Sequence, residues 1–250
     1  MKYQPGRSMT HRLHPLLKLG WLLWLTVAVF AFHSPFLPVV VVVCAVLLLW
    51  SSGVAPRRIP GVRAWVAVGT LLLVTHALSD REGAVIVGPL TADGLGAGVR
   101  AAGRLLAVIS LSTLFVTTTE PVSLVFALVS MGLPYRWGFT LMTALRLAPV
   151  FRVEAHHVYR AQLVRGVAYD RLVFRRWWAM AKYLCFPLLV SALRSAHSLS
   201  LSMEGRAFGL HPRRTYMRQV QLGRLDTVAG VTLAVSMLVA VAYGLGYISL

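Results

Sequence analysis

The stretches AQLVRG (residues 161–166) and MEGRAFG (residues 203–209) decide how this sequence is interpreted. Each ends a long helical pattern, and each places an arginine beside small residues. Glycine is typical of a helix C-cap, and a basic residue there offsets the negative end of the helix dipole. Both stretches lie in a basic region between apolar segments, so we expect them to be tips that contact soluble partner proteins. The residues predicted to dock are Val164, Arg165, Gly166, Gly205, Arg206 and Ala207.

The composition is that of a membrane protein with several spans. Of the 250 residues, 57% are hydrophobic and 13% are charged, whereas a soluble domain carries about a quarter charged residues. The net charge of +17 indicates cytoplasmic segments that follow the positive-inside rule. Nucleic-acid binding is the second interpretation of this charge, but no basic and aromatic surface module accompanies it. The cysteines, Cys44 and Cys185, form no CxxC pair, so we expect neither a disulfide nor a zinc site.

Five apolar segments are predicted to span the membrane. The second is short, because a span usually needs about 20 apolar residues. The N-terminus, the loop after the second segment and the region after the fourth are basic, whereas the intervening loops are uncharged or net acidic. Lysine and arginine stay on the cytoplasmic side, so we expect the N-terminus inside and the C-terminus outside. The segments are residues 16–32, 36–50, 64–78, 99–119 and 225–248.

We expect the basic region, residues 121–224, to be a cytoplasmic domain between a membrane domain (1–120) and the last span (225–250). An arginine at the centre of a span costs about 2.5–3.5 kcal/mol, so its arginines favour amphipathic helices below the membrane surface. The sequence predicts three such helices, the second and third of them long. Residues 182–196 are the most apolar part and could instead dip into the bilayer. The three helices are residues 121–131, 135–165 and 186–206.

Serines recur along the third of these helices at spacings of four, three and four. Small side chains let two helices approach closely, and Ala144, Ala148 and Ala155 of the second helix are the expected partners. We therefore expect the two long helices to cross face to face, with their arginine ends projecting as a pair. The alternative is that the serines only face a polar cavity. The serines are Ser191, Ser195, Ser198 and Ser202.

Common catalytic patterns are missing from the sequence. It contains no GxxxxGK[ST] phosphate loop, no HExxH, no nucleophile elbow and no paired carboxylates, so no cofactor is expected. Arg104, inside the fourth apolar segment, is expected to pair with Asp93 or with a helix end. Two further functions stay open. One is a membrane-embedded enzyme acting on a lipid or isoprenoid phosphate; the other is a self-sufficient carrier, which needs a midplane polar site and internal repeats.

Several motifs, in order along the chain, resemble those of one family: the CbiQ/EcfT family, the transmembrane (T) components of energy-coupling factor transporters. The opening YQPGRSMTHRLHPLLK (residues 3–18) is similar to the family's YxPGxSxxHxLxPxxK. TTTEP (117–121), with Arg104, resembles its fourth-span ending. LRLAP (145–149), with Glu154, resembles its second coupling helix.

The two arginine stretches resemble the family's Ala-Arg-Gly or Ala-Arg-Ser motifs. They depart from them in Val164, which stands where alanine is usual, and in Gly205 and Ala207, which flank the second arginine. Both arginines are kept, so the resemblance still implies docking.

The resemblance implies an all-α membrane protein of about five transmembrane helices, with a cytoplasmic coupling domain of three helices, two of them long and crossed. It further implies a non-catalytic scaffold. The arginine-bearing ends insert into grooves on two ABC-type ATPase subunits, which bind the ATP. A small membrane subunit that binds the substrate, the S component, takes up a vitamin or transition-metal ion. The expected partners are these subunits and the lipid bilayer of the bacterial cell membrane, without nucleic acid.

Overall fold

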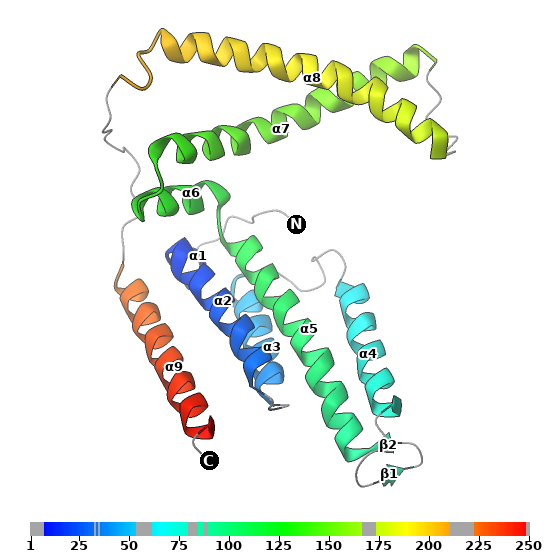
Figure 1. Ribbon diagram of the computed structural model, residues 1–250, viewed down its shortest axis with the longest axis vertical. Helices are drawn as coiled ribbons and strands as arrows, with labels where there is room; N and C mark the ends of the chain where they lie inside the picture. Colours follow the sequence, from blue (N-terminus) through cyan, green and yellow to red (C-terminus); the bar gives the residue numbers. More distant parts are fainter. Residues whose placement is uncertain are drawn as a thin grey trace. The chain divides into compact units, whose positions relative to one another are not determined.

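The computed structural model describes residues 8–32, 34, 36–53, 62–79, 85–87, 90–166, 174–210 and 223–248. These residues form nine helices and one two-stranded antiparallel sheet (Figure 1). The chain divides into two compact units. We call Met1–Met131 with Val220–Leu250 the membrane unit and Gly132–Gln219 the coupling unit.

The membrane unit contains most of the apolar helices. Its helices are α1 (Met9–Arg12), α2 (Pro15–Ala31), α3 (Phe36–Ser51), α4 (Val62–Ser79), α5 (Ala92–Thr118), α6 (Pro121–Ser130) and α9 (Arg224–Ile248). The strands β1 (Val85–Val87) and β2 (Leu90–Thr91) pair between α4 and α5.

Three helices in the described part of the chain are long and apolar enough to cross a membrane. Two belong to α5 and α9 of the membrane unit, and the third lies in the coupling unit. The helices α2, α3 and α4 are apolar but shorter. Helices and composition together therefore identify a membrane protein. The three long segments are Gly94–Thr118, Lys182–Glu204 and Arg224–Ala242.

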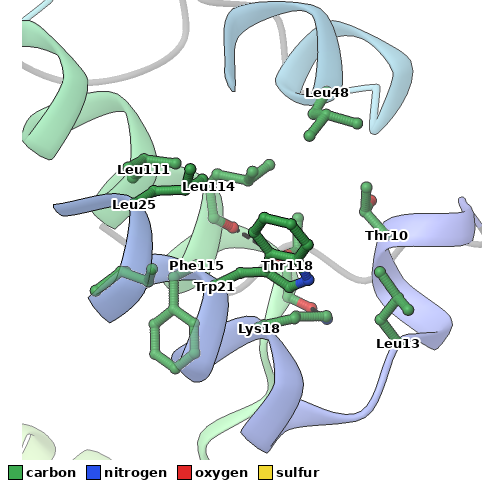
Figure 2. A pocket seen from close by; sticks show the side chains of 11 residues that line it. Thr10, Leu13, Lys18, Trp21, Leu25, Leu48, Leu111, Leu114, Phe115 and Thr118 are labelled. Carbon is green, nitrogen blue, oxygen red and sulfur yellow. Dashed lines mark hydrogen bonds between the residues drawn. The ribbon is translucent and has the colours of Figure 1, made fainter. Parts of the chain in front are cut away.

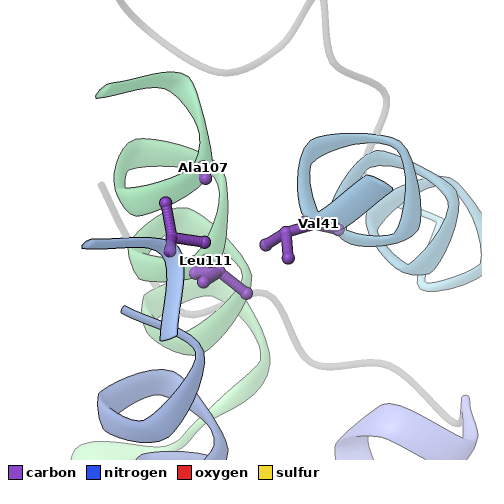
Figure 3. Close-up of a cluster of buried hydrophobic side chains, with 5 residues drawn as sticks. Val41, Ala107 and Leu111 are labelled. Carbon is purple, nitrogen blue, oxygen red and sulfur yellow. The ribbon is translucent and has the colours of Figure 1, made fainter. Parts of the chain in front are cut away.

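Helix α5 is the centre of the membrane unit, because α2, α3 and α4 all pack against it. Side chains one turn apart on a helix share a face, and Ala107 and Leu111 of α5 meet Val41 and Ala45 of α3 in this way, with Val29 of α2 completing the core. Figure 3 shows Val41 pointing across towards Ala107 and Leu111. Apart from Leu111, this core is therefore built from alanine and valine side chains, which allow the helices to lie close together.

Glycines on α5 set how closely its neighbours approach. A Cβ added at Gly98 would lie 2.7 Å from the Leu73 carbonyl oxygen of α4. A Cβ at Gly103 would lie 2.9 Å from Cβ of Pro38 on α3. Both distances are shorter than real contacts, so glycine is required where these helices touch.

Helices α2 and α5 are antiparallel, and each contributes a cationic side chain that caps the C-terminus of the other. Lys18, near the start of α2, donates from Nζ to the carbonyl oxygen of Thr118, the last residue of α5 (3.0 Å). Arg104 of α5 donates to the carbonyl oxygens of Val29 (3.1 Å) and Phe32 (3.4 Å) at the end of α2. Carbonyls at a helix C-terminus have no partner within the helix and carry its negative dipole end. The expectation that Arg104 pairs with a helix end is confirmed.

The structure changes three sequence-based boundaries. Helix α5 begins at Ala92, ahead of the predicted residue 99, because packing against α4 at Gly98 overrides the low helix propensity of its glycines. Helix α8 (Phe174–Glu204) begins before the predicted residue 186, since arginine and lysine are good helix formers. Helix α6 packs against α2, with Val125 and Ala127 buried, so it belongs to the membrane unit, whereas the sequence assigned it to the coupling domain. The two short strands were not predicted either.

Candidate docking site

The coupling unit is built on two long antiparallel helices, α7 (Tyr135–Val164) and α8 (Figure 1). Near the end of α7, Gln162 Nε2 donates to the carbonyl oxygen of Tyr183 (3.4 Å). Further back along α7, Glu154 Oε1 accepts from Ser191 Oγ (3.2 Å). At the start of α7, the ring of Phe139 packs 4.5 Å from that of Phe208. Later residues of α8 therefore contact earlier residues of α7, as in any antiparallel helix pair.

The serines of α8 lie beside α7, but their neighbours differ from those expected. Ser191 binds Glu154, while the other three serines line a cavity of about 480 Å³ together with Leu147 of α7. The expected partners Ala144 and Ala148 are exposed, and Ala155 is partly buried. The bulkier side chains of Leu147 and Glu154 face α8 instead and leave space between the helices. The serines that line this cavity are Ser195, Ser198 and Ser202.

The first arginine tip ends α7 in a left-handed turn. Arg165 is the C-cap residue, and its backbone amide donates to the Ala161 carbonyl (3.2 Å). Gly166 follows with φ of +77° and donates to the Leu163 carbonyl (3.0 Å). Glycine adopts this conformation without a steric penalty. Val164 beside it is 89% exposed, so this end of the helix is open to a partner.

The second arginine tip ends α8 in a Schellman motif. The amide of Phe208 donates to the Met203 carbonyl (3.0 Å), and the amide of Ala207 donates to the Glu204 carbonyl (2.9 Å), which is the hydrogen-bond pair of that motif. Ala207 takes the left-handed position with φ of +52°. An L-residue there costs about 1–2 kcal/mol relative to glycine. Arg206 therefore stands directly before the left-handed residue, as Arg165 does in the first tip.

An aromatic cluster fastens the second tip to α7. The ring of Phe208 lies 4.5 Å from that of Phe139 and 5.8 Å from that of Tyr135, and the latter two rings are 6.0 Å apart. Aromatic pairs at such separations contribute about 0.5–1.5 kcal/mol beyond the area they bury. Sequence reasoning missed this cluster. Its signal was present in two aromatic residues one turn apart at the start of α7 and a third directly after the second arginine motif.

The two tips lie at opposite ends of the helix pair. Because α7 and α8 are antiparallel and both tips are C-terminal, the expectation that they project together as a pair is wrong. Helix α7 has 30 residues, and at about 1.5 Å per residue the helix alone is about 45 Å long. The tips are therefore two separate sites, each on its own helix end.

Both tip arginines are exposed and free to meet a partner. Arg165 and Arg206 lie in exposed positions, as do Gly166, Gly205 and Ala207. Among the described residues, neither guanidinium makes a hydrogen bond or an ion pair. In the same part of the chain, no three His, Cys, Asp or Glu side chains gather as a metal site would require.

A cavity of about 310 Å³ lies in the membrane unit between α1, α2, α3 and α5 (Figure 2). Its lining is apolar except for Thr10, Lys18 and Thr118. The Lys18 amine is held by the Thr118 carbonyl, and a solute pocket usually offers several convergent polar groups. The cavity therefore does not resemble the midplane polar site of a self-sufficient carrier.

Asp226 joins the two ends of the membrane unit. One carboxylate oxygen accepts from the amide of His14 (2.6 Å) and the other from the amide of Gly223 (2.8 Å). Asp226 is the third residue of α9, and a carboxylate there completes half of a capping box and favours the positive end of the helix. Sequence reasoning missed this residue, whose signal was an acid at the start of an apolar span.

Comparisons with known proteins agree with this architecture. Residues 6–217 match the model of the CbiQ family, described as cobalt transport protein. The protein named energy-coupling factor transporter transmembrane protein EcfT from Acidaminococcus fermentans is 30% identical, over 96% of this chain and 94% of its own. Proteins of the same name from Thermotoga maritima (28%; 97% and 92%) and Bacillus subtilis (30%; 94% and 93%) are similar.

These relatives confirm the resemblance inferred from the motifs. They are similar over nearly their whole length, so the correspondence includes both units. Their names describe transporter components and give no support to the alternative of a membrane enzyme. The chain belongs to the CbiQ/EcfT family, the transmembrane components of energy-coupling factor transporters.

Proposed function

We propose that the protein is the coupling subunit of an ATP-driven importer and that Arg165 and Arg206 dock on two ABC-type ATPase subunits. The observation that carries this proposal is the shared geometry of the two tips. Each arginine ends a long helix, directly precedes a left-handed residue, and is exposed. Two similar cationic ends at opposite ends of one helix pair suit two similar receiving surfaces.

Arginine suits such a contact chemically. Its planar guanidinium donates in a fork that pairs with a carboxylate or with the carbonyls of a helix end. The small residues Gly166, Gly205 and Ala207 let the backbone of a partner come close to the cation. Truncating one such anchor at an interface often costs about 2 kcal/mol or more.

The helix pair offers a way to transmit force. Contacts from Gln162–Tyr183 to Phe139–Phe208 join α7 and α8 along much of their length. A movement of the ATPase subunits at the tips would therefore displace the pair as a whole. We propose that exposed apolar side chains of the pair, such as Leu145, Phe186 and Leu189, contact the membrane S component, which releases a vitamin or transition-metal ion inside.

We propose five spans, α2, α3, α4, α5 and α9, with the N-terminus in the cytoplasm. Helix α8 is long enough to span, but it packs along α7, and α7 carries the exposed arginines Arg146, Arg152 and Arg160. If α8 crossed the membrane, α7 would have to enter it as well. Burying each of these arginines in hydrocarbon would cost about 2.5–3.5 kcal/mol. With Cys44 and Cys185 replaced by serine, a cysteine in place of Ser34 should react with an impermeant thiol reagent from outside, and one in place of Ser51 only from inside. The reverse pattern would refute this orientation.

The docking proposal is tested by reversing the charge of the tips. Arg165→Glu and Arg206→Glu together should abolish copurification of the ATPase subunits while leaving membrane insertion intact, and each change alone should weaken it. Arg152→Glu is the matched control, because Arg152 is exposed in the middle of α7. Retention of both ATPase subunits and of ATP-dependent uptake by the double variant would show that the tips do not dock.

A further inference from the structure

The two tips share a backbone conformation but differ in what supports it. In the first tip, the left-handed position belongs to Gly166, which has no Cβ to clash. In the second, it belongs to Ala207, the one non-glycine residue with positive φ in the described part of the chain. Alanine disfavours this conformation. The second tip therefore requires a compensating contact that the first does not.

Phe208 provides that contact. It is partly buried, whereas Gly205, Arg206, Ala207 and Gly209 around it are exposed. Its amide closes the Schellman turn on Met203. Its ring packs 4.5 Å from Phe139 and 5.8 Å from Tyr135, both on the first turns of α7. The turn that presents Arg206 is thus hydrogen-bonded to α8 through its backbone and packed against α7 through an aromatic ring.

We propose that Phe208 is a positioning residue for Arg206: packed on Tyr135 and Phe139, it holds the strained turn at Ala207 and fixes the direction in which the Arg206 guanidinium meets its ATPase subunit. This rests on the docking role proposed for Arg206. Without the ring contact, the turn at Ala207 opens, and Arg206 must be ordered again each time the partner binds, which lowers affinity. The first tip, closed by glycine, has no such requirement.

The arrangement also gives the second tip a direct mechanical connection to α7. Arg206 and Phe208 are separated by one residue, and the Phe208 ring touches two residues at the start of α7. A displacement of Arg206 by its ATPase subunit therefore passes to the beginning of α7 without travelling along α8. Replacing the ring would uncouple this connection while leaving the arginine in place.

A double-mutant cycle tests the proposal, with the membrane-inserted protein in lipid nanodiscs and the ATPase subunits of its own transporter as the probe. In an Arg165→Glu background, where only the second tip can dock, Phe208→Ala should weaken ATPase binding about tenfold. In an Arg206→Glu background, Phe208→Ala should cause no further loss. Contacts in one network are non-additive in this way, whereas independent effects add. Equal losses in both backgrounds would mean that Phe208 supports only the fold, and would overturn the proposal.

Rescue separates positioning from folding. Phe208→Tyr keeps the ring and should keep full binding. Ala207→Gly removes the strain, so the double variant Ala207→Gly with Phe208→Ala should bind the ATPase subunit about threefold more tightly than Phe208→Ala alone. Leu210→Ala is the matched control, since Leu210 is 72% exposed two residues further on, and it should bind as the parent does.

The outcomes also distinguish the positioning role of Phe208 from the docking role of Arg206 on which it rests. Strong loss with Arg206→Glu but none with Phe208→Ala refutes the positioning role and leaves docking standing. Unchanged binding with Arg206→Glu refutes both. A failure of Ala207→Gly to improve Phe208→Ala would show that strain at Ala207 is not what the ring offsets.

Discussion

The α2–α5 pair of the membrane unit and the α7–α8 pair of the coupling unit are both antiparallel, and both place cations at helix C-termini. In the first pair, Lys18 and Arg104 each donate to the terminal carbonyls of the opposite helix. In the second, Arg165 and Arg206 lie at the ends of their own helices, and their guanidinium groups donate to no described residue. The same chemistry thus has two uses in one chain.

The proposed surroundings, a bilayer around α2 and α5 and water around the tips of α7 and α8, explain the difference. Within a bilayer no water satisfies a helix-end carbonyl or a cation, so an unpaired group of either kind costs several kcal/mol. Lys18 and Arg104 satisfy both requirements at once. In water an exposed arginine is solvated, and a surface ion pair adds little. Charge at the tips of α7 and α8 is therefore available for a partner that excludes water.

The largest expected effect comes from removing a cap in the membrane pair. Arg104→Met leaves the carbonyl oxygens of Val29 and Phe32 without their donor. Loss of these charged, partly buried hydrogen bonds should lower the free energy of unfolding by about 2–3 kcal/mol. Arg165→Met, at an exposed tip, should change it by less than about 0.5 kcal/mol. Thermal unfolding of both variants in detergent compares the two pairs, and similar shifts would contradict the distinction drawn between them.

Close packing offers a second comparison of the pairs. Gly98→Ala would bring a Cβ to 2.7 Å from the Leu73 carbonyl, whereas at Gly205 of the coupling unit the nearest atom to an added Cβ is 3.5 Å away. Overpacking against backbone should destabilise the membrane unit by about 1–3 kcal/mol. Gly205→Ala should stay within about 0.5 kcal/mol of the parent.

A control for Gly98→Ala is available on the same helix. An added Cβ at Gly96 meets only the flexible end of Arg100, at 3.5 Å. Gly96→Ala should therefore leave the thermal unfolding of the protein nearly unchanged. A destabilisation equal to that of Gly98→Ala would show that helix propensity, and not the approach of α4 to α5, requires the glycine.

Some parts of the fold could be predicted from the sequence, and others depend on contacts between helices. The helices were predictable where apolar periodicity and turn residues agree, as in α7, predicted at 135–165 and found at Tyr135–Val164. The start of α5 was not, because Gly94 and Gly98 argue against a helix, and only the structure shows that α4 packs against Gly98. The family followed from motifs in order, and the comparisons confirm it.

The site was predictable in its residues and not in its geometry. Both arginines stand out because each follows a long helical pattern beside small residues. That the tips lie apart depends on the antiparallel pairing of α7 and α8, which no local pattern specifies. The contact of Phe208 with Phe139 joins residues far apart in the sequence, so it too required the structure. The docking role itself remains a prediction.

The smallest expected effect separates the two tips from each other. Gly166→Ala places a Cβ at φ of +77°, and should weaken the last turn of α7 by about 1 kcal/mol, whereas Ala207→Gly should strengthen the last turn of α8 by a similar amount. The backbone amides of Gly166 and Ala207 donate within these turns, so their hydrogen exchange reports each turn locally. We expect faster exchange at residues 163–166 in the first variant and slower exchange at 203–208 in the second, with the membrane unit unchanged in both. Changes in exchange rate of opposite direction at the two tips would follow from a strained second turn. Faster exchange in both variants would mean that the aromatic cluster already holds Ala207 without strain.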